Sequence, residues 1–163
     1  MGLGRLLRTW FAEGELDISP DQVLLTDSCT QAVDLICRLL VRRGVTVLVD
    51  DPCYFNFQAL LRAHEIRIVG VPYTATGPDT EAFEQIVLQE KPRLYITNSA
   101  LHNPTGATLS PQTAFRLLST AAASGVLIVE DDIFADFETA PSPRLAVMDG
   151  LEHVIRIGSF SKT

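Results

Sequence analysis

The residues with the clearest chemical potential stand at the end of the chain, where a lysine lies between two hydroxyl residues. Lys162 is flanked by Ser161 and Thr163, and Ser159 precedes them. These residues follow an apolar, strand-like run at 154–158. A lysine amine can attack an aldehyde, and neighbouring hydroxyl groups can donate hydrogen bonds to a phosphate. The segment therefore predicts a pyridoxal phosphate site, although a lysine considered alone is most often a solvated surface residue.

Two adjacent carboxylates, Asp131 and Asp132, follow another apolar run at 126–129. A metal site is the obvious alternative for them. However, the nearby Glu130 and Asp136 supply neither the spacing of a calcium loop nor a histidine companion, so we expect no metal. A carboxylate beside a pyridine nitrogen would keep that nitrogen protonated by charge attraction. Because neighbouring strand residues point to opposite faces, only one of the two aspartates can reach such a ring.

Three other polar segments could complete the same site, and each also has a simpler structural interpretation. Ser28, Cys29 and Thr30 open a predicted helix, where free N–H groups and the helix dipole favour a phosphate. Ser28 could equally be an ordinary N-cap, and both interpretations can hold together. Tyr54 could stack on a flat cofactor or pack in the core. Asn103 could donate its amide hydrogens to a phenolate oxygen or simply form a turn.

The turns that carry Tyr54 and Asn103 each contain a proline. Pro52 and Pro104 are predicted to follow cis peptide bonds, because both turns are tight and must aim these side chains back at one ligand. The energetic penalty for the cis form is small at an X-Pro bond.

The elements that must position these residues alternate along the chain. Apolar runs predict strands, and helical spacing predicts helices between them. The strands are expected at residues 23–25, 45–49, 66–71, 93–97, 126–129 and 154–158, and the helices at 3–14, 28–42, 55–64, 80–89 and 111–124. This order indicates an α/β fold of three layers, with helices on both faces of a mostly parallel sheet. Ligands of such sheets bind at the carboxyl ends of the strands, where the polar segments lie.

Composition restricts the expected partners and compartment. The chain has 163 residues and a formal net charge of -7, which opposes attraction to a nucleic acid backbone, so we do not expect this segment to bind DNA itself. Cys29, Cys37 and Cys53 show neither a paired spacing nor nearby histidines, which argues against a disulfide framework and a zinc site. The sequence contains no signal peptide pattern and no apolar run of membrane-spanning length. We therefore expect a cytoplasmic protein without membrane contact.

Three short motifs, taken together, resemble those of the class I and II aminotransferases, which are fold-type I pyridoxal phosphate enzymes. The motifs are His102-Asn103-Pro104-Thr105-Gly106, Asp131-Asp132-Ile133-Phe134 and Ser159-Phe160-Ser161-Lys162. Residues 97–111 further resemble the aminotransferase-like domain of MocR-type regulators, which carry a GntR-type winged-helix DNA-binding domain ahead of it. The resemblance covers nearly the whole chain, and the motifs are specific in combination.

The resemblance implies a role for each candidate residue. Lys162 would form the internal aldimine with pyridoxal 5'-phosphate, and Asp131 would pair with the ring nitrogen. Asn103 would contact the phenolic oxygen, and Tyr54 would stack on the ring. The phosphate would be surrounded by Ser28, Cys29, Thr30, Ser159 and Ser161. In the implied reaction the amine of Lys162 moves a proton between the substrate carbon and the cofactor, and an amino acid becomes a keto acid.

Two residues depart from the family pattern. Phe134 stands where the family commonly has a tyrosine whose hydroxyl contacts the phenolic oxygen, so one hydrogen-bond donor is missing. Ser28 stands where relatives of the regulator type usually have a glycine, which changes how closely the backbone can approach a phosphate.

The resemblance also implies that residues 1–163 form part of the large pyridoxal phosphate-binding domain of a longer, homodimeric protein. The small domain and any winged helix would lie outside the segment, so we expect the segment alone to be inactive. Two functions stay open: an aminotransferase acting on an amino acid and a keto acid, or the effector- or cofactor-sensing domain of a MocR-type transcription regulator that contacts DNA through an N-terminal domain. A third interpretation, a nucleotide-binding α/β domain, lacks a phosphate loop.

Overall fold

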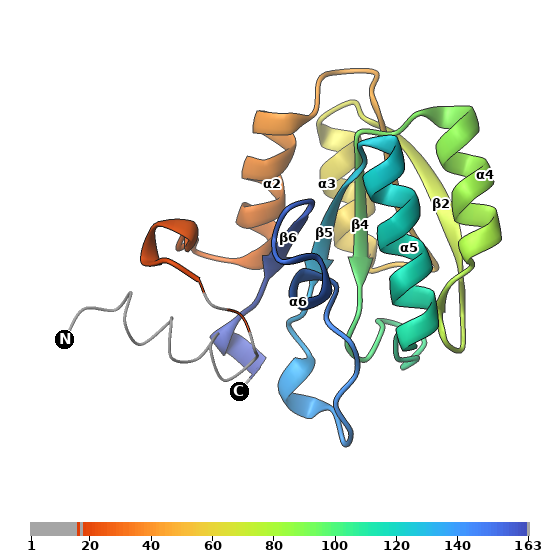
Figure 1. Ribbon diagram of the computed structural model, residues 1–163. Helices are drawn as coiled ribbons and strands as arrows, with labels where there is room; N and C mark the ends of the chain where they lie inside the picture. Colours follow the sequence, from red (N-terminus) through yellow and green to blue (C-terminus); the bar gives the residue numbers. More distant parts are fainter. Residues whose placement is uncertain (1–15, 17, 163) are drawn as a thin grey trace.

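A six-stranded sheet forms the centre of the protein (Figure 1). The computed structural model describes residue 16 and residues 18–162. The strands lie in the order β3-β2-β1-β4-β5-β6, and every neighbouring pair is parallel except β2 and β3. Their bounds are β1 Thr46–Asp51, β2 Arg67–Thr74, β3 Gly77–Pro78, β4 Leu94–Asn98, β5 Leu127–Asp131 and β6 Val154–Ile157. The expected three-layer α/β architecture with a mostly parallel sheet is confirmed.

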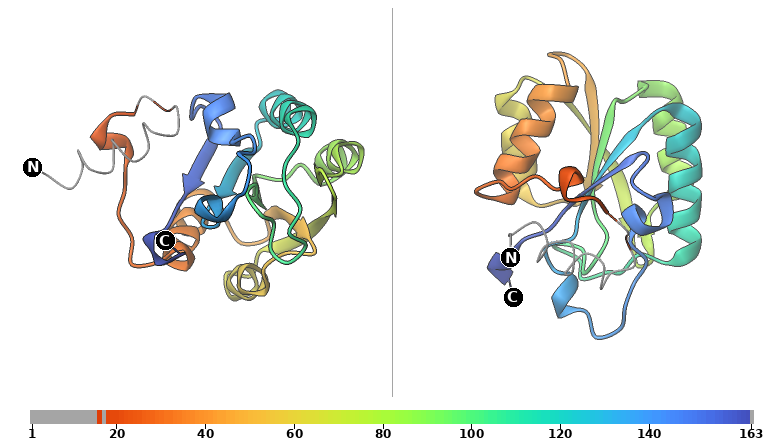
Figure 2. Two further views of the ribbon diagram at one scale, coloured as in Figure 1. Left: turned by 90° about the horizontal axis from the view of Figure 1, so that it is seen from below. Right: turned by 60° about the vertical axis from the view of Figure 1, so that its left-hand side comes forward.

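Helices cover both faces of the sheet (Figure 2). Helices α2 and α3 pack on one face, and α4, α5 and α6 pack on the other. The helices are α2 Cys29–Leu40, α3 Phe55–Ala63, α4 Thr80–Glu90, α5 Pro111–Ser124 and α6 Leu145–Asp149, with 3₁₀ turns η1 Pro20–Gln22, η2 Ala135–Phe137 and η3 Phe160–Lys162. Within the described residues, none of the helices is long and apolar enough to cross a membrane.

The two faces are built by alternation along the central strands. In β4, Tyr95 packs with α4 and α5, whereas its neighbours Leu94 and Ile96 pack with α2 and α3. Leu48 of β1 and Ile128 of β5 repeat the pattern toward the α5 side. Successive side chains of a strand point to opposite faces, so strands covered on both sides become apolar throughout.

Local signals fix the helix ends that hold this sheet together. The hydroxyl of Ser110 accepts a hydrogen bond from the backbone nitrogen of Thr113, and Pro111 occupies the first turn of α5. Gly125 ends the helix with a φ of 68°, a left-handed conformation that glycine adopts without steric cost. The observed bounds of α5 match the predicted helix at 111–124, and α2, α3 and α4 lie within two residues or so of their predictions.

Some sequence predictions differ from the structure. The predicted strand at 23–25 is wrong: no strand pairs with it among the described residues, and Leu24 and Leu25 are 89% and 61% exposed. A short apolar run becomes a strand only when a neighbouring strand supplies its hydrogen bonds. Among the described residues the sheet ends at β6, and the 23–25 run does not extend it. The prediction also missed β3 and α6. The helix predicted at 3–14 lies outside the described residues.

Both predicted cis peptide bonds are present. The bonds Asp51–Pro52 and Asn103–Pro104 are cis. They follow β1 and β4, so the two turns leave neighbouring strands of the sheet at the same edge.

Candidate functional site

The carboxyl ends of β1, β4 and β5 border a small cavity of about 150 Å³. The ends meet because these strands are neighbours in the sheet and run in the same direction, as Figure 1 shows for β4 and β5. Three residues singled out in the sequence, Tyr54, Asn103 and Asp131, line this cavity together. The other lining residues are Asp50, Cys53, Phe57, Ile96, Asn98, Ile133 and Phe134.

Asp131 is the most electrostatically perturbed residue of the cavity wall. Its side chain is only 4% exposed, and burial raises its pKa from an ordinary 3.8 to about 7. The backbone nitrogen of Ile133 donates a hydrogen bond to it at 3.3 Å and lowers the pKa, whereas the charges of Asp132 and Asp50 raise it. A buried carboxylate in this environment favours either a proton or a cationic N–H partner.

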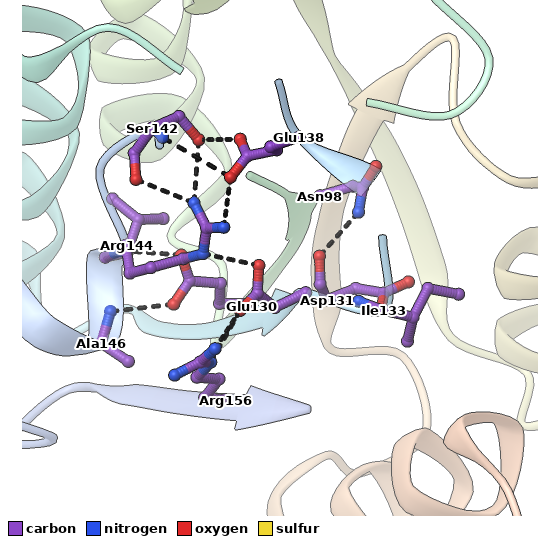
Figure 3. Close-up of polar contacts among 11 residues, drawn as sticks. Asn98, Glu130, Asp131, Ile133, Glu138, Ser142, Arg144, Ala146 and Arg156 are labelled. Atoms are coloured by element: carbon purple, nitrogen blue, oxygen red, sulfur yellow. Dashed lines mark hydrogen bonds and ion pairs between the residues drawn. The ribbon is translucent and has the colours of Figure 1, made fainter. Parts of the chain in front are cut away.

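Asp132 does not line the cavity and instead belongs to an ion-pair cluster. Figure 3 shows the two arginines of this cluster, Arg144 and Arg156. Oδ1 of Asp132 lies 2.8 Å from Nε of Arg144, and its Oδ2 lies 2.8 Å from Nε of Arg156. Both arginines are largely buried, at 14% and 13% exposure. Burial raises the pKa of Asp132, and the two guanidinium groups oppose that rise. Only Asp131 therefore faces the cavity, as the alternation argument predicts.

The same cluster secures the loop that follows β5. Arg144 also pairs with Glu138, and its Nη1 donates to the carbonyl of Ser142 at 2.8 Å. Glu130, which is fully buried, accepts hydrogen bonds from the backbone nitrogens of Leu145 and Ala146 at 2.7 and 2.9 Å. This carboxylate replaces a side-chain cap at the start of α6, because Arg144 in the cap position makes no capping bond.

Asn98 connects two parts of the cavity wall, and the sequence analysis gave it no role. Its Nδ2 donates to the carbonyl oxygen of Asp131 at 2.6 Å, and its Oδ1 accepts from the backbone nitrogen of Asn103 at 2.9 Å. The sequence signal that could have identified Asn98 is its position, as a polar residue directly at the end of an apolar strand.

Asp50, a second lining residue to which the sequence assigned no role, is hydrogen-bonded to Asn98. Its carboxylate accepts hydrogen bonds from the hydroxyl of Tyr95, from Oγ1 of Thr97 at 3.1 Å and from the backbone nitrogen of Asn98 at 3.0 Å. Nε2 of His102 lies 3.3 Å from Oδ2 of Asp50, but the geometry is not that of a well-directed hydrogen bond. The buried carboxylate of Asp50 thus joins β1 to β4 in the cavity wall.

Tyr54 lies between the cavity and the hydrophobic core. Its ring lines the cavity and also packs edge-on against Phe57 with the ring centroids 5.6 Å apart. Its hydroxyl accepts a hydrogen bond from Nδ2 of Asn56 at 2.7 Å. Phe134 lines the same cavity with an apolar ring that offers no hydrogen-bond donor.

The residues predicted to surround a phosphate do not line this cavity. Ser28 caps α2, since its hydroxyl accepts from the backbone nitrogen of Gln31 at 3.1 Å. Cys29 links this helix start to the end of β6: its Sγ lies 3.8 Å from the carbonyl oxygen of Gly158. Burial raises the pKa of the Cys29 thiol, the charge of Asp131 raises it further and the Ser159 hydroxyl lowers it, so Cys29 lies close to both.

The remaining predicted residues continue from β6. The hydroxyl oxygens of Ser159 and Ser161 lie 2.8 Å apart, and the backbone nitrogen of Ser161 donates to the Ser159 hydroxyl at 3.1 Å. Lys162 ends η3, the 3₁₀ turn that follows β6. Thr30 lies exposed in the first turn of α2. Within residues 16 and 18–162, no group of three His, Cys, Asp or Glu residues could hold a metal ion.

Comparison with known proteins identifies similar chains. The family model described as aminotransferase class I and II matches residues 3–163. The 2-aminoadipate transaminase of Thermus thermophilus is 34% identical over 161 residues, which cover 96% of this chain and 40% of that protein. The transcriptional regulator YisV of Bacillus subtilis, of the helix-turn-helix type, is 28% identical over 151 residues, which cover 91% of this chain and 31% of the regulator.

Solved structures give the same result. LysN, the α-aminoadipate aminotransferase of Thermus thermophilus, was solved in complex with N-(5'-phosphopyridoxyl)-L-leucine; it is 32% identical, with a TM-score of 0.88 over 98% of this chain and 41% of LysN. An archaeal alanine:glyoxylate aminotransferase is 28% identical, with a TM-score of 0.90 over 98% of this chain and 42% of that enzyme. The chain thus spans less than half the length of these relatives.

Proposed function

We propose that this chain, which belongs to the class I and II aminotransferase family, binds pyridoxal 5'-phosphate and serves the transfer of an amino group between an amino acid and a keto acid. The observation that carries the proposal is the buried carboxylate of Asp131 on the wall of a cavity shared with Tyr54 and Asn103. The solved relative LysN holds a phosphopyridoxyl compound, which supports the same cofactor here.

The cavity residues fit this cofactor chemically. A protonated pyridine nitrogen is a cationic N–H donor, which is the partner that a buried carboxylate with a pKa of about 7 favours. The ring of Tyr54 offers an aromatic surface, and the side-chain amide of Asn103 offers hydrogen-bond donors. The alternative partner for Asp131, a metal ion, would need further ligands that the described residues do not bring together.

Each residue then has a defined task. Asp131 holds a proton on the ring nitrogen, Tyr54 packs on the ring, and Asn103 donates to the phenolic oxygen. The start of α2 would hold the phosphate, because the helix dipole and the first backbone N–H groups favour an anion there. The partners of the phosphate in this proposal are Ser28, Cys29, Thr30, Ser159 and Ser161.

When bound, pyridoxal phosphate supplies an electron sink for a carbanion at the substrate carbon. We assign the covalent attachment and the proton transfer at that carbon to the amine of Lys162. The chain has two lysines, and their positions differ. Lys162 follows the carboxyl end of β6, whereas Lys91 caps the carboxyl end of α4 and precedes β4, at the opposite edge of the sheet. Only the first edge carries the cavity.

The test uses the full-length protein, pyridoxal phosphate and borohydride. We expect a new absorbance band on adding the cofactor, and reduction followed by peptide mass mapping should mark Lys162. Lys162→Ala should abolish the mark, and Lys91→Ala should leave it in place. Labelling at Lys91 with Lys162 unmodified would overturn the assignment.

The match to YisV supports a second candidate, a cofactor- or effector-sensing domain of a transcription regulator. The two candidates are separated by assaying the full-length protein for keto acid formation with a panel of amino acids that includes 2-aminoadipate, and for binding to duplex DNA. Turnover without DNA binding supports the transaminase, and DNA binding modulated by pyridoxal phosphate or an amino acid supports the regulator. Homodimerisation and a cytoplasmic location remain predictions for the full-length protein.

A further inference from the structure

The side-chain amide of Asn98 uses both of its ends in the cavity wall. Its nitrogen donates to the carbonyl oxygen of Asp131 at 2.6 Å, a contact visible in Figure 3. Its oxygen accepts from the backbone nitrogen of Asn103 at 2.9 Å. Asn98 is only 6% exposed, so water has little access to compete for either contact. One amide therefore joins the end of β5 to the turn that follows β4.

The backbone of Asn98 is held by two hydrogen bonds of its own. Its backbone nitrogen donates to Oδ2 of Asp50 at 3.0 Å, and that carboxylate is immobilised by the hydroxyls of Tyr95 and Thr97. On the other side, the hydroxyl of Tyr73 donates to the carbonyl oxygen of Asn98 at 3.0 Å. The backbone of Asn98 is thereby held through both its N–H group and its carbonyl oxygen. The position from which its side chain extends is therefore fixed.

We propose that Asn98 is a positioning residue, whose side chain sets the distance and orientation between Asp131 and Asn103 at the cofactor cavity. This inference rests on the proposed function, because those two residues are the ones assigned to the ring nitrogen and the phenolic oxygen. Both groups must meet one rigid ring, so their relative placement decides whether both contacts form at once.

The chemistry of the contacts explains why the residue is an asparagine. One partner is a carbonyl, which needs a donor, and the other is an N–H, which needs an acceptor. An amide supplies both on one planar group, whereas a carboxylate of the same size supplies acceptors alone. Serine is too short to reach two partners on different segments.

The experiment compares Asn98→Ala with Ser99→Ala in the full-length protein. Ser99 is the next residue and is also buried, but it does not line the cavity. The first readout is hydrogen exchange of the cofactor-free protein in a peptide spanning residues 99–106. The second is the dissociation constant of pyridoxal phosphate, and the third is the pH midpoint of the bound cofactor's absorbance change.

We expect Asn98→Ala to accelerate exchange at the Asn103 amide, to weaken pyridoxal phosphate binding about tenfold and to shift the absorbance midpoint. Ser99→Ala should retain the wild-type exchange, affinity and midpoint. If Asn98→Ala does not fold, Asn98→Ser, which keeps a polar group but cannot span both partners, is expected to give the same three changes.

The outcomes separate this inference from the proposed function. Unchanged exchange at Asn103 in the Asn98 variant overturns the inference whatever the cofactor does. Unchanged affinity and midpoint despite faster exchange also overturn it, since Asn98 would then be merely structural. Failure of the wild-type protein to bind pyridoxal phosphate refutes the proposed function, and the positioning role at the cofactor falls with it.

Discussion

The buried carboxylate of Asp131 predicts a pH dependence of stability that can be measured without any activity assay. Its pKa is about 7 in the folded protein and near 3.8 when exposed, with burial as the main cause. The folded state therefore binds this proton more tightly than the unfolded state. The stability that it contributes is fully present below about pH 3.8 and is lost as the pH rises to about 7.

The size of the effect follows from the difference between the two pKa values. About three pH units at 1.36 kcal/mol each amount to roughly 4 kcal/mol, an order-of-magnitude value. Somewhat more than half of that loss, roughly 2.5 kcal/mol, falls between pH 5 and pH 8, a range in which unfolding is readily measured.

The perturbation is Asp131→Asn, which keeps the size of the side chain and removes its titration. The assay is urea unfolding of cofactor-free, full-length wild type and variant from pH 5 to pH 8, followed by circular dichroism. The variant should gain roughly 2.5 kcal/mol relative to wild type as the pH rises, because only the wild type pays for a buried charge at high pH. Any constant cost of the new amide cancels in this comparison.

Asp136→Asn is the matched control, because Asp136 is exposed in the loop after the same strand. Its stability difference from wild type should not vary with pH. A constant difference for Asp131→Asn as well, or one that changes in favour of the wild type with rising pH, would refute the reasoning about this carboxylate.

Three further predictions concern the surroundings of the cavity. Asp132→Ala should destabilise the protein by up to about 3–5 kcal/mol in urea unfolding, because it removes the buried carboxylate that pairs with both Arg144 and Arg156. Exposed Asp136→Ala should cost less than about 0.5 kcal/mol, and equal costs would contradict the ion-pair cluster. Ser28→Ala should lower the free energy of unfolding by about 1 kcal/mol, because the N-cap of α2 is lost, and should also weaken pyridoxal phosphate binding in an absorbance titration. Ser110→Ala, which removes the cap of α5, should leave that affinity unchanged. Residues 1–163 expressed alone should form no keto acid from any amino acid, because the transaminases that this chain resembles are more than twice as long and must orient a substrate as well as a cofactor. Robust turnover would contradict this.

Patterns that depend on neighbouring residues in the chain predicted much of the fold. The bounds of α5 follow from Ser110, Pro111 and Gly125, which are all local signals. The opposite directions of Asp131 and Asp132 follow from strand alternation alone. Both kinds of prediction depend only on a few consecutive residues, so they can be made without knowledge of the tertiary structure.

Features that depend on distant partners could not be predicted in the same way. The apolar run at 23–25 has the composition of a strand, but pairing decides whether it becomes one. Helix α6 has five residues, and its first turn is held by Glu130 from another element. The roles of Asn98 and Asp50 arise from hydrogen bonds that join β1, β4 and β5. The spacing of residues along the chain does not reveal such bonds.

A crystal structure of the full-length protein with pyridoxal phosphate would test the central claim most directly. We predict the ring in the cavity between Tyr54 and Asn103, with its nitrogen about 2.7–2.9 Å from the carboxylate of Asp131, and the phosphate at the start of α2. A ring bound elsewhere, or a ring nitrogen without a contact to Asp131, would contradict the assignment of this cavity as the cofactor site.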